Sequence, residues 1–482
     1  MTIVTRVLPL EPVADLAAAI AAGCGQAIEA ARASGGDAVL ATVADAGLRG
    51  RGGAGFSTGA KWKSVVANRP ADDPLTVIVN AAEGEPGTWK DHAIVRADPY
   101  RVIEGALIAA TVVGADRVVV ATKAAFIEEL ARLRSAVEEV AASDLAGGIA
   151  LEIVEGPSSY LFGEETGLLE VVDGRPPLPR VSVPWQQGVE VNEPTLINNV
   201  ETLANVPGIV LHGPAWFREH GTKESPGTLV ATLTGRVHTA GVVEVAMGTT
   251  LRWVIEEVAG GVLGDHVVAV LNGAASAPIP VADLDTPLTY EDMKAIGSGL
   301  GSASFIVLDD ETDVAAVAAG VARFLAVESC GQCTPCKTEG LALAAVLDGI
   351  RSGNPDPSDM EKVHDHLRRV VDRARCPLAG QQETVVGRLV ELFPGSFTSH
   401  IEGRVPGSPA FPVIPVVGFA GGQAILDEHQ LEKQPDWTYD AVDSGTFPAA
   451  RFSDPDAARA TASAGDEVAE EFIDEDATAG DG

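Results

Sequence analysis

The sequence has few aromatic residues, few basic residues and no long apolar run. Aromatic residues make up 5% of the 482 positions, and 34 Lys and Arg stand against 68 Asp and Glu, for a formal charge of −34. Such a surface repels nucleic acid and anionic membranes. The longest apolar runs have strand length, far short of the roughly 20 residues of a membrane span. With no signal-peptide pattern at the N-terminus, the sequence predicts a cytoplasmic protein with no direct membrane insertion and no nucleic-acid partner.

Cysteine is also scarce, but four of the five cysteines form a pattern. Cys330, Cys333 and Cys336 are separated by two residues each, and Cys376 follows 40 positions later (376 − 336). Three closely spaced thiolates and one remote thiolate can surround a cubane cluster from several directions. A zinc ion is the alternative, although zinc sites favour two separated Cys-x-x-Cys pairs. The pattern therefore favours a 4Fe-4S cluster, with Cys24 as a small apolar residue outside it.

The first part of the chain alternates predicted strands with predicted helices. After short helices within residues 12–46, the apolar pattern indicates a strand at 75–80, a helix at 98–113, a strand at 116–121 and a helix at 125–140. This alternation is typical of an α/β domain with a mostly parallel sheet.

The pattern changes near residue 226. Strands at 228–233 and 241–245, a helix at 250–258 and a strand at 266–271 indicate a small β-grasp-like domain, and the chain becomes helical from residue 314. We therefore predict an α/β fold in four regions: an α/β domain with N-terminal helices at 1–225, a β-grasp domain at 226–305, a helical iron–sulfur domain at 306–402 and an irregular extension at 403–482. The acidic stretch 466–476 is predicted to be disordered.

A glycine-rich segment, Gly47 to Trp62, is the first candidate binding loop. No strand immediately precedes it, so it is not the dinucleotide-binding G-x-G-x-x-G signature. Its glycines still allow the backbone to approach a ring or a phosphate closely. Positive charge for an anionic group would come from Arg49, Arg51 and Lys61, and stacking surfaces from Phe56 and Trp62. A structural turn between helices is the alternative for this segment taken alone.

Two acidic loops and a pair of amides are further candidates. Glu83 and Glu85 follow a predicted strand, at the position where α/β proteins bind ligands. Glu164 and Glu165 are adjacent carboxylates, which are usually solvated or matched to hydrogen-bond donors. The tandem amides Asn198–Asn199 can read the heteroatoms of a flavin, or can cap a helix. Taken alone, each acidic loop is better explained as surface, and the amide pair as a helix cap.

In their order along the chain, these segments resemble the family of 51-kDa flavoprotein subunits. The motifs, within about residues 25–402, are Gly-Leu-Arg-Gly-Arg-Gly-Gly-Ala-Gly-Phe, Glu-Gly-Glu-Pro-Gly, Gly-Glu-Glu-Thr, Ile-Asn-Asn-Val-Glu-Thr-Leu and Glu-Ser-Cys-Gly-Gln-Cys-Thr-Pro-Cys. The family comprises the NADH-oxidising subunit of complex I and the diaphorase subunits of NAD-linked hydrogenases and formate dehydrogenases. The resemblance implies FMN, a 4Fe-4S cluster and NAD(H), with hydride transfer on the flavin and no catalytic side chain.

The resemblance also implies roles for individual residues. Those lining FMN would be Gly50, Gly52, Gly53, Lys61, Asn80, Tyr160, Gly163, Glu164, Asn198 and Asn199. Phe56 would stack on the adenine of NAD(H), and the acidic rim of Glu83, Glu85 and Glu165 would favour NAD over NADP. The cluster ligands would be Cys330, Cys333, Cys336 and Cys376.

Three positions depart from the family pattern: Ala82 replaces a usual Asp, Phe162 a frequent Cys and Ser64 an aromatic residue. With the extension after residue 403, these departures favour a soluble NAD-dependent formate dehydrogenase, in which other iron–sulfur subunits and a molybdenum or tungsten catalytic subunit are the expected partners. The alternatives are the complex I subunit and an NAD-reducing hydrogenase. A non-catalytic scaffold with a structural metal is the remote alternative.

Overall fold

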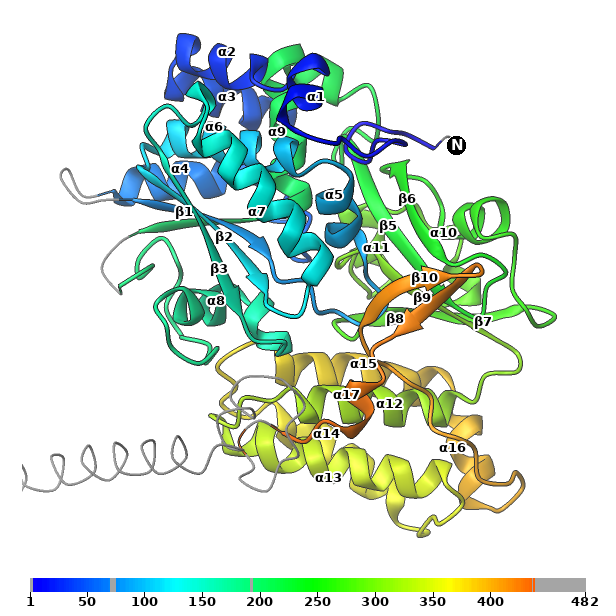
Figure 1. Ribbon diagram of the computed structural model, residues 1–482. Helices are drawn as coiled ribbons and strands as arrows, with labels where there is room; N and C mark the ends of the chain where they lie inside the picture. The colour runs from blue at the N-terminus through cyan, green and yellow to red at the C-terminus, as the bar shows by residue number, and fades with distance from the viewer. Residues whose placement is uncertain (1–2, 70–74, 191–193, 436, 438–482) are drawn as a thin grey trace, which may run out of the picture.

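The computed structural model describes residues 3–69, 75–190, 194–435 and 437. Figure 1 shows an α/β part, a second part built on its own sheet and a helical part that packs below both. The stretch 466–476, predicted to be disordered, lies outside the described residues. The predicted α/β fold class is confirmed.

The first part is built on a four-stranded parallel sheet in the order β3-β2-β1-β4. Its strands are β1 (Thr76–Ala81), β2 (Arg117–Lys123), β3 (Ala150–Gly156) and β4 (Thr195–Asn199). Because the strands are parallel, their carboxyl ends share one edge, where Asn80 pairs with Asn199 in register. The candidate segments that follow β1 and β4 therefore meet at this edge.

Helices surround this sheet. They are α1 (Leu16–Ala21), α2 (Gln26–Ser34), α3 (Gly36–Ala46), α4 (Thr58–Asn68), α5 (Lys90–Ala97), α6 (Pro99–Val113), α7 (Ile127–Ala141), α8 (Glu165–Val172) and α9 (Val200–Phe217). The glycine-rich segment is shorter than predicted, because the Ser57 hydroxyl accepts a hydrogen bond from Ala60 N (3.3 Å) and starts α4 inside it.

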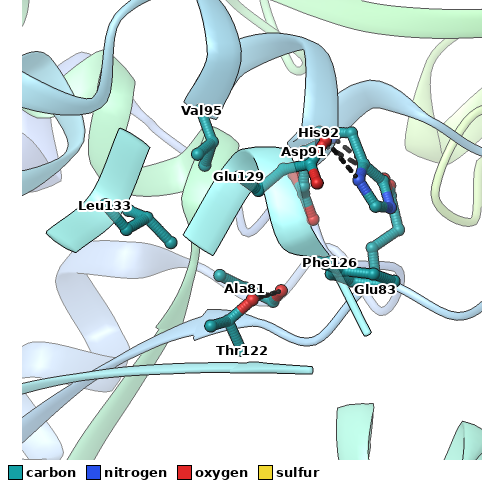
Figure 2. Close-up of a pocket in the computed structure, with 9 residues that line it drawn as sticks. All are labelled: Ala81, Glu83, Asp91, His92, Val95, Thr122, Phe126, Glu129 and Leu133. Carbon is teal, nitrogen blue, oxygen red and sulfur yellow. Dashed lines mark hydrogen bonds and ion pairs between the residues drawn. The ribbon is translucent and has the colours of Figure 1, made fainter. Parts of the chain in front are cut away.

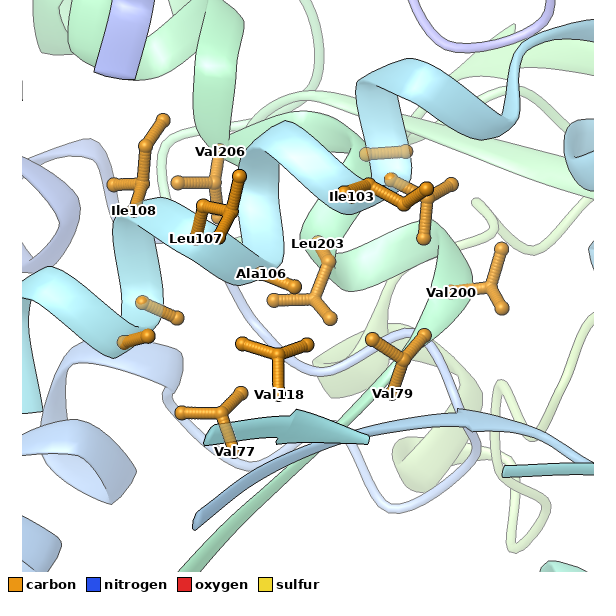
Figure 3. Packing of buried hydrophobic residues seen from close by; sticks show 14 of the residues in the cluster. Val77, Val79, Ile103, Ala106, Leu107, Ile108, Val118, Val200, Leu203 and Val206 are labelled. Carbon is orange, nitrogen blue, oxygen red and sulfur yellow. The ribbon is translucent and has the colours of Figure 1, made fainter. Parts of the chain in front are cut away.

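Helices α6 and α9 form the core over one face of the sheet. Figure 3 shows Leu107 of α6 and Leu203 of α9 above Val79 and Val118 of the strands. The helices approach closely at Gly105, where an added Cβ would lie 2.1 Å from the Leu203 carbonyl oxygen. This contact fixes α9, and with it the Asn198–Asn199 pair at its start.

The second part is a five-stranded mixed sheet in the order β6-β5-β9-β7-β8. Its elements are β5 (Thr228–Gly235), β6 (Gly241–Ala246), α10 (Leu251–Trp253), β7 (Val267–Asn272), β8 (Ser276–Pro280), α11 (Tyr290–Ala295) and β9 (Ser304–Asp309). The predicted helix at 250–258 is one α-helical turn followed by a π-helical turn at Val254–Val258.

The third part is helical, and the chain then returns to the second sheet. Its helices are α12 (Val314–Val327), α13 (Thr334–Arg351), α14 (Asp359–Val370), α15 (Leu378–Leu392) and α16 (Pro394–Ile401). The extension was predicted to be irregular, but it forms a hairpin of β10 (Val416–Ala420) and β11 (Gln423–Leu426) and a short helix α17 (His429–Glu432). Across the described ranges, no helix combines the length and apolar character needed to cross a membrane.

Replacing Gly105 by Ala would force α6 away from α9. We expect the free energy of unfolding to fall by about 1–3 kcal/mol, as measured by urea unfolding. The matched control is Gly380→Ala in α15, where an added Cβ meets nothing within 4 Å. The control should be neutral or stabilising by up to about 1 kcal/mol. Equal destabilisation by both changes would contradict the close helix contact.

Candidate functional site

A cavity of about 580 Å³ lies where the three parts meet. Its volume is that of a cofactor or ligand site. The fourteen residues predicted to bind FMN or NAD all line it: Gly50, Gly52, Gly53, Phe56, Lys61, Asn80, Glu83, Glu85, Tyr160, Gly163, Glu164, Glu165, Asn198 and Asn199. The structure thus brings the predicted set together, and the contact that each residue makes with a ligand is a prediction.

The glycine-rich loop is held by its arginines. The Arg51 guanidinium donates to the carbonyl oxygens of Thr228 (3.1 Å) and Pro226 (3.2 Å) and to the Tyr290 hydroxyl (3.0 Å). The Arg49 guanidinium lies 3.9 Å above the centre of the Tyr290 ring. Both side chains were expected to attract an anionic ligand, but their charges are used to dock the loop on the second sheet.

Trp62 also differs from its predicted role. It was expected to offer a stacking surface, but it is fully buried in the first core, where its indole N–H donates to Asn198 Oδ1 (2.8 Å). By contrast, Phe56 is 54% exposed at the cavity lip. Within residues 47–62, all of which the structure describes, Phe56 is therefore the aromatic side chain that is free to stack on a ring.

Asn199 of the amide pair caps a helix, as one of its two predicted uses requires, and its ligand-binding use stays a prediction. Asn199 caps α9, because its Oδ1 accepts from Glu201 N (3.0 Å), and it also lines the cavity. The same oxygen accepts from the buried Lys90 ammonium (3.1 Å), while its Nδ2 donates to Asp91 (2.6 Å). The capping explanation and the binding explanation are therefore compatible for this residue.

Glu83 is buried at the start of α5 rather than exposed on a rim. Its carboxylate accepts from the backbone N–H of Asp91 (3.1 Å) and from the Thr88 hydroxyl (2.9 Å). Burial and the neighbouring Asp91 raise its pKa. Figure 2 shows Glu83 with His92 and Glu129 around a small pocket behind the main cavity.

His92 and Glu129 lie next to each other behind Glu83. His92 Nδ1 lies 3.0 Å from Glu129 Oε1 without forming a directed hydrogen bond. Burial acts to raise the pKa of Glu129, but His92 and Arg96 outweigh it and lower the pKa to about 2. Glu129 is therefore a fixed negative charge behind the site.

Glu85 bridges all three parts. Its carboxylate accepts from the Tyr160 hydroxyl (2.6 Å) and from Ala274 N of the second sheet (2.5 Å), and Tyr160 also meets Gln381 of α15 (3.4 Å). Burial raises the pKa of Glu85 to about 7 despite these donors. Glu85 therefore takes up a proton at higher pH than an ordinary glutamate.

In the second acidic loop, the carboxylates of Glu164 and Glu165 have different environments. Glu164 caps α8 by accepting from Thr166 N (3.0 Å) and Gly167 N (2.8 Å), and burial raises its pKa. Glu165 is 42% exposed and forms an ion pair with Lys61 across the cavity wall. Of the acidic side chains expected to form a rim, Glu165 is the one with a clearly solvated carboxylate.

The three residues that depart from the family pattern lie in different environments. Ala82 is buried and lines the cavity, so the missing carboxylate would have reached the ligand space. Phe162 is fully buried and fills the small core beneath β1 and β2. Ser64 does not line the cavity, and its hydroxyl donates to the Ala60 carbonyl within α4.

Sequence reasoning missed the cavity residues contributed by the second sheet and α15. Asn272 is the clearest of them, because its Nδ2 donates to the carbonyl oxygens of Gly299 (2.5 Å) and Leu300 (3.2 Å), while its buried Oδ1 has no hydrogen-bond partner among the described residues. Asn272 thus brings an amide from the second sheet to the cavity wall. No local signal in the sequence marks Asn272, since it ends an ordinary strand, β7.

The four predicted cluster cysteines line one smaller cavity. Cys333 caps α13, Cys336 lies in its first turn, Cys330 follows α12, and Cys376 precedes α15. Burial raises the pKa of Cys376 to about 12 and also raises that of Cys336. Cys24 lies apart, against the first core.

The four cysteines suit a 4Fe-4S cluster, because a cubane takes one thiolate for each of its iron atoms and the four thiols line one common cavity.

The two cavities adjoin. Leu161 and Leu378 line both the 580 Å³ cavity and the cysteine cavity. The loop bearing Tyr160 is also tied to the cysteine loop, because Tyr160 N donates to Glu328 Oε2 (2.8 Å). A group in one cavity is therefore a direct neighbour of a group in the other.

Comparisons with known proteins agree with this arrangement. The pattern of the Nuo51 FMN-binding domain matches residues 43–208, and that of the NADH-ubiquinone oxidoreductase-F iron–sulfur binding region matches residues 316–400. An NADH-quinone oxidoreductase subunit of Rhizobium meliloti is 37% identical over 380 residues, covering 76% of this chain and 90% of that protein. An NADH-quinone oxidoreductase subunit of Mycobacterium tuberculosis is 36% identical over 391 residues, covering 78% and 88%.

A solved structure is similar as well. The crystal structure of an NAD+-reducing [NiFe]-hydrogenase in the H2-reduced state superimposes with a TM-score of 0.72 at 34% identity, covering 80% of this chain. This chain spans 66% of that hydrogenase chain.

Fold, cavities and cysteines together define an NAD-linked flavin and iron–sulfur oxidoreductase subunit, with FMN, a 4Fe-4S cluster and NADH as its cofactors and substrate. The chain belongs to the 51-kDa flavoprotein family, which includes the two NADH-quinone oxidoreductase relatives above. The family and the enzyme class predicted from the motifs are thereby confirmed.

Replacing Glu85 by Gln should stabilise the protein increasingly as pH rises. The folded-state pKa of about 7 lies above the ordinary value of 4.5, so the protonated form is favoured on folding and stability is lost between these values. From pH 5 to pH 8 the stability of Glu85→Gln relative to the parent should rise by about 2–3 kcal/mol. Urea unfolding at several pH values measures this difference.

Glu129→Gln is the matched control for that titration. The pKa of Glu129 is lowered to about 2, so its contribution to stability is already complete above about pH 6 and is lost only in acid. The stability difference between Glu129→Gln and the parent should therefore be flat from pH 6 to pH 8. A flat profile for Glu85→Gln would contradict the raised pKa of Glu85.

Replacing Cys376 by Ser should remove the cluster and leave the flavin. We expect loss of the iron and of the electron paramagnetic resonance (EPR) signal of the reduced cluster. FMN content should stay unchanged, because Cys376 lines the cysteine cavity and not the large cavity. Cys24→Ser should retain all iron, since Cys24 packs against a separate core. Full iron retention in Cys376→Ser would show that the four cysteines do not act together.

Proposed function

We propose that this chain exchanges hydride with NAD(H) on FMN in the 580 Å³ cavity and single electrons with the cluster, as the diaphorase subunit of an NAD-dependent formate dehydrogenase. The observation that supports the electron path is the wall of Leu161 and Leu378 shared by the two cavities. FMN, when bound, converts two-electron nicotinamide chemistry into one-electron steps. The side chains described here position these groups, and none is required as an acid or a base.

The proposed FMN set combines close backbone approach with fixed dipoles. Gly50, Gly52 and Gly53 leave the loop without side chains at the cavity, and Lys61 supplies the positive charge for a phosphate. Because Lys61 is already paired with Glu165, a bound phosphate would compete for its ammonium. The other members of the set are Asn80, Tyr160, Gly163, Glu164, Asn198 and Asn199.

The proposed NAD(H) set lies toward the lip. Phe56 presents an exposed ring for adenine, and Glu165 presents the most solvated carboxylate against a 2′-phosphate. Glu83 is buried beneath α5, and Glu85 carries only part of a charge near neutral pH, so both contribute less to this repulsion. The preference for NAD over NADP is therefore expected to depend more on Glu165 than on Glu85.

The choice of complex rests on the extension. The iron–sulfur pattern ends at residue 400, and the two NADH-quinone oxidoreductase relatives align with only 76–78% of this chain. A cytoplasmic complex with other iron–sulfur subunits and a molybdenum or tungsten subunit would give this added segment a use. The relatives are named for quinone reduction and for hydrogenase activity, so a quinone-reducing complex and a hydrogenase are the competing assignments.

Phe56→Ala should weaken binding of NADH without loss of FMN. Stacking of a base on an aromatic ring contributes about 1–3 kcal/mol, so we expect the KM for NADH in ferricyanide reduction to rise about tenfold. Reduced nicotinamide mononucleotide, which lacks adenine, provides the internal control and should show an unchanged KM. An equal change for both substrates would contradict the stacking role.

The complex is identified by its partners and its donor. Full-length tagged chain isolated from its native cells should carry further iron–sulfur subunits and a molybdenum or tungsten protein, and should reduce NAD with formate. NAD reduction with hydrogen by a preparation containing nickel, or NADH oxidation coupled to quinone by membrane subunits, would replace formate as the assignment. In each of these outcomes the flavin and cluster chemistry of this chain would stand.

A further inference from the structure

The C-terminal extension passes over the cysteine loop, Glu328 to Cys336. In Figure 1 it runs from the β10–β11 hairpin beside the second sheet down to α17 against the helical part. The matched iron–sulfur region ends at residue 400, so this segment lies beyond the part that the family pattern describes.

The extension contacts the loop through a fully buried ion pair. Lys433 Nζ donates to Glu328 Oε1 (2.8 Å), and these side chains are 0% and 2% exposed. The same oxygen accepts from Gln430 Nε2 (2.5 Å), while Glu328 Oε2 accepts from Tyr160 N (2.8 Å). Glu328 therefore connects the extension, the cysteine loop and the flavin cavity, and it lies two residues before Cys330.

Trp437 makes a second, independent contact. Its ring lies against Gly331, where an added Cβ would be 2.6 Å from Trp437 Cδ1, and the Lys337 ammonium lies 4.0 Å above the ring. Gly331 has a φ of +78°, so glycine suits both its backbone and this approach. Trp437 thus covers the backbone between Cys330 and Cys333 without lining the cysteine cavity itself.

We propose that residues 427–435 together with Trp437 act as a clasp on the cysteine loop, in which Lys433 and Trp437 are positioning residues that set the reduction potential of the cluster and shield it from solvent. The proposal rests on the cluster assignment above. Lys433 neutralises a buried carboxylate beside a cluster ligand, and a negative charge left there would disfavour addition of an electron. Trp437 excludes water from one side of the loop.

Three variants of the full-length protein test the clasp. Lys433→Met should shift the midpoint potential of the cluster to more negative values in an EPR-monitored redox titration, because Glu328 loses its buried partner. The double variant Glu328→Gln/Lys433→Met should return it toward the parent value. Trp437→Ala should lose cluster absorbance in air about tenfold faster through easier local opening.

The matched control is Gln423→Ala, in the same extension but away from the cysteines. Gln423 Nε2 donates to Val237 O (3.1 Å) and His238 O (3.4 Å), so its loss loosens the hairpin on the second sheet alone. It should lower thermal stability and leave the potential and the air sensitivity unchanged.

The outcomes are separable. Unchanged potential and unchanged air sensitivity in both Lys433→Met and Trp437→Ala would overturn the clasp, as would equal shifts in Gln423→Ala. If Lys433→Met does not accumulate, the air sensitivity of Trp437→Ala against that of Gln423→Ala decides. Parent protein that contains no iron would instead refute the cluster assignment.

Discussion

The proposed electron path depends on one wall. Leu161 and Leu378 line both the large cavity and the cysteine cavity. Because the rate of electron transfer falls steeply with distance, this shared apolar wall is the constraint that the path places on the other elements. Three structural parts meet at it: the loop after β3 supplies Leu161, α15 supplies Leu378, and the second sheet completes the large cavity through Asn272. The hydrogen bond from Tyr160 N to Glu328 holds the two loops in register. An enzyme that must pass single electrons onward has a structural reason to unite three parts around one wall.

The cavity is built largely from helix starts. Glu83 accepts from the first turn of α5, Glu164 from that of α8, and Asn199 caps α9. The N–H groups at these helix ends are thus paired with protein acceptors, two of which are carboxylates. The same carboxylates and amides that complete the helices also line the cavity, so their structural and binding uses cannot be separated by simple deletion. Variants at the lip, where Phe56 and Glu165 are exposed, change the site without breaking a helix cap.

Much of this could be predicted from sequence because it is local or periodic. Strands β1 and β2 of the parallel sheet were predicted from apolar runs, whereas β3 and β4 were not, and the shared carboxyl edge of parallel strands explains why Asn80 and Asn199 meet. The cysteine spacing predicted which four thiols share a cavity. The rest depends on contacts between distant positions: Arg51 reaches Thr228, Trp62 turns inward to Asn198, Asn272 enters from another sheet, and Lys433 reaches Glu328. Nothing in the neighbouring sequence of these residues records their partners, so their roles required the three-dimensional structure.

NADH, the flavin and the cluster are proposed to form one electron path within this chain. Anaerobic titration of the purified chain with NADH, followed by absorbance and EPR, tests this path most directly. We expect the flavin absorbance to bleach and a single 4Fe-4S signal to appear in the same titration, with no other subunit present. The path would be contradicted if NADH bleaches the flavin but leaves the cluster oxidised, although dithionite reduces the cluster at a comparable potential.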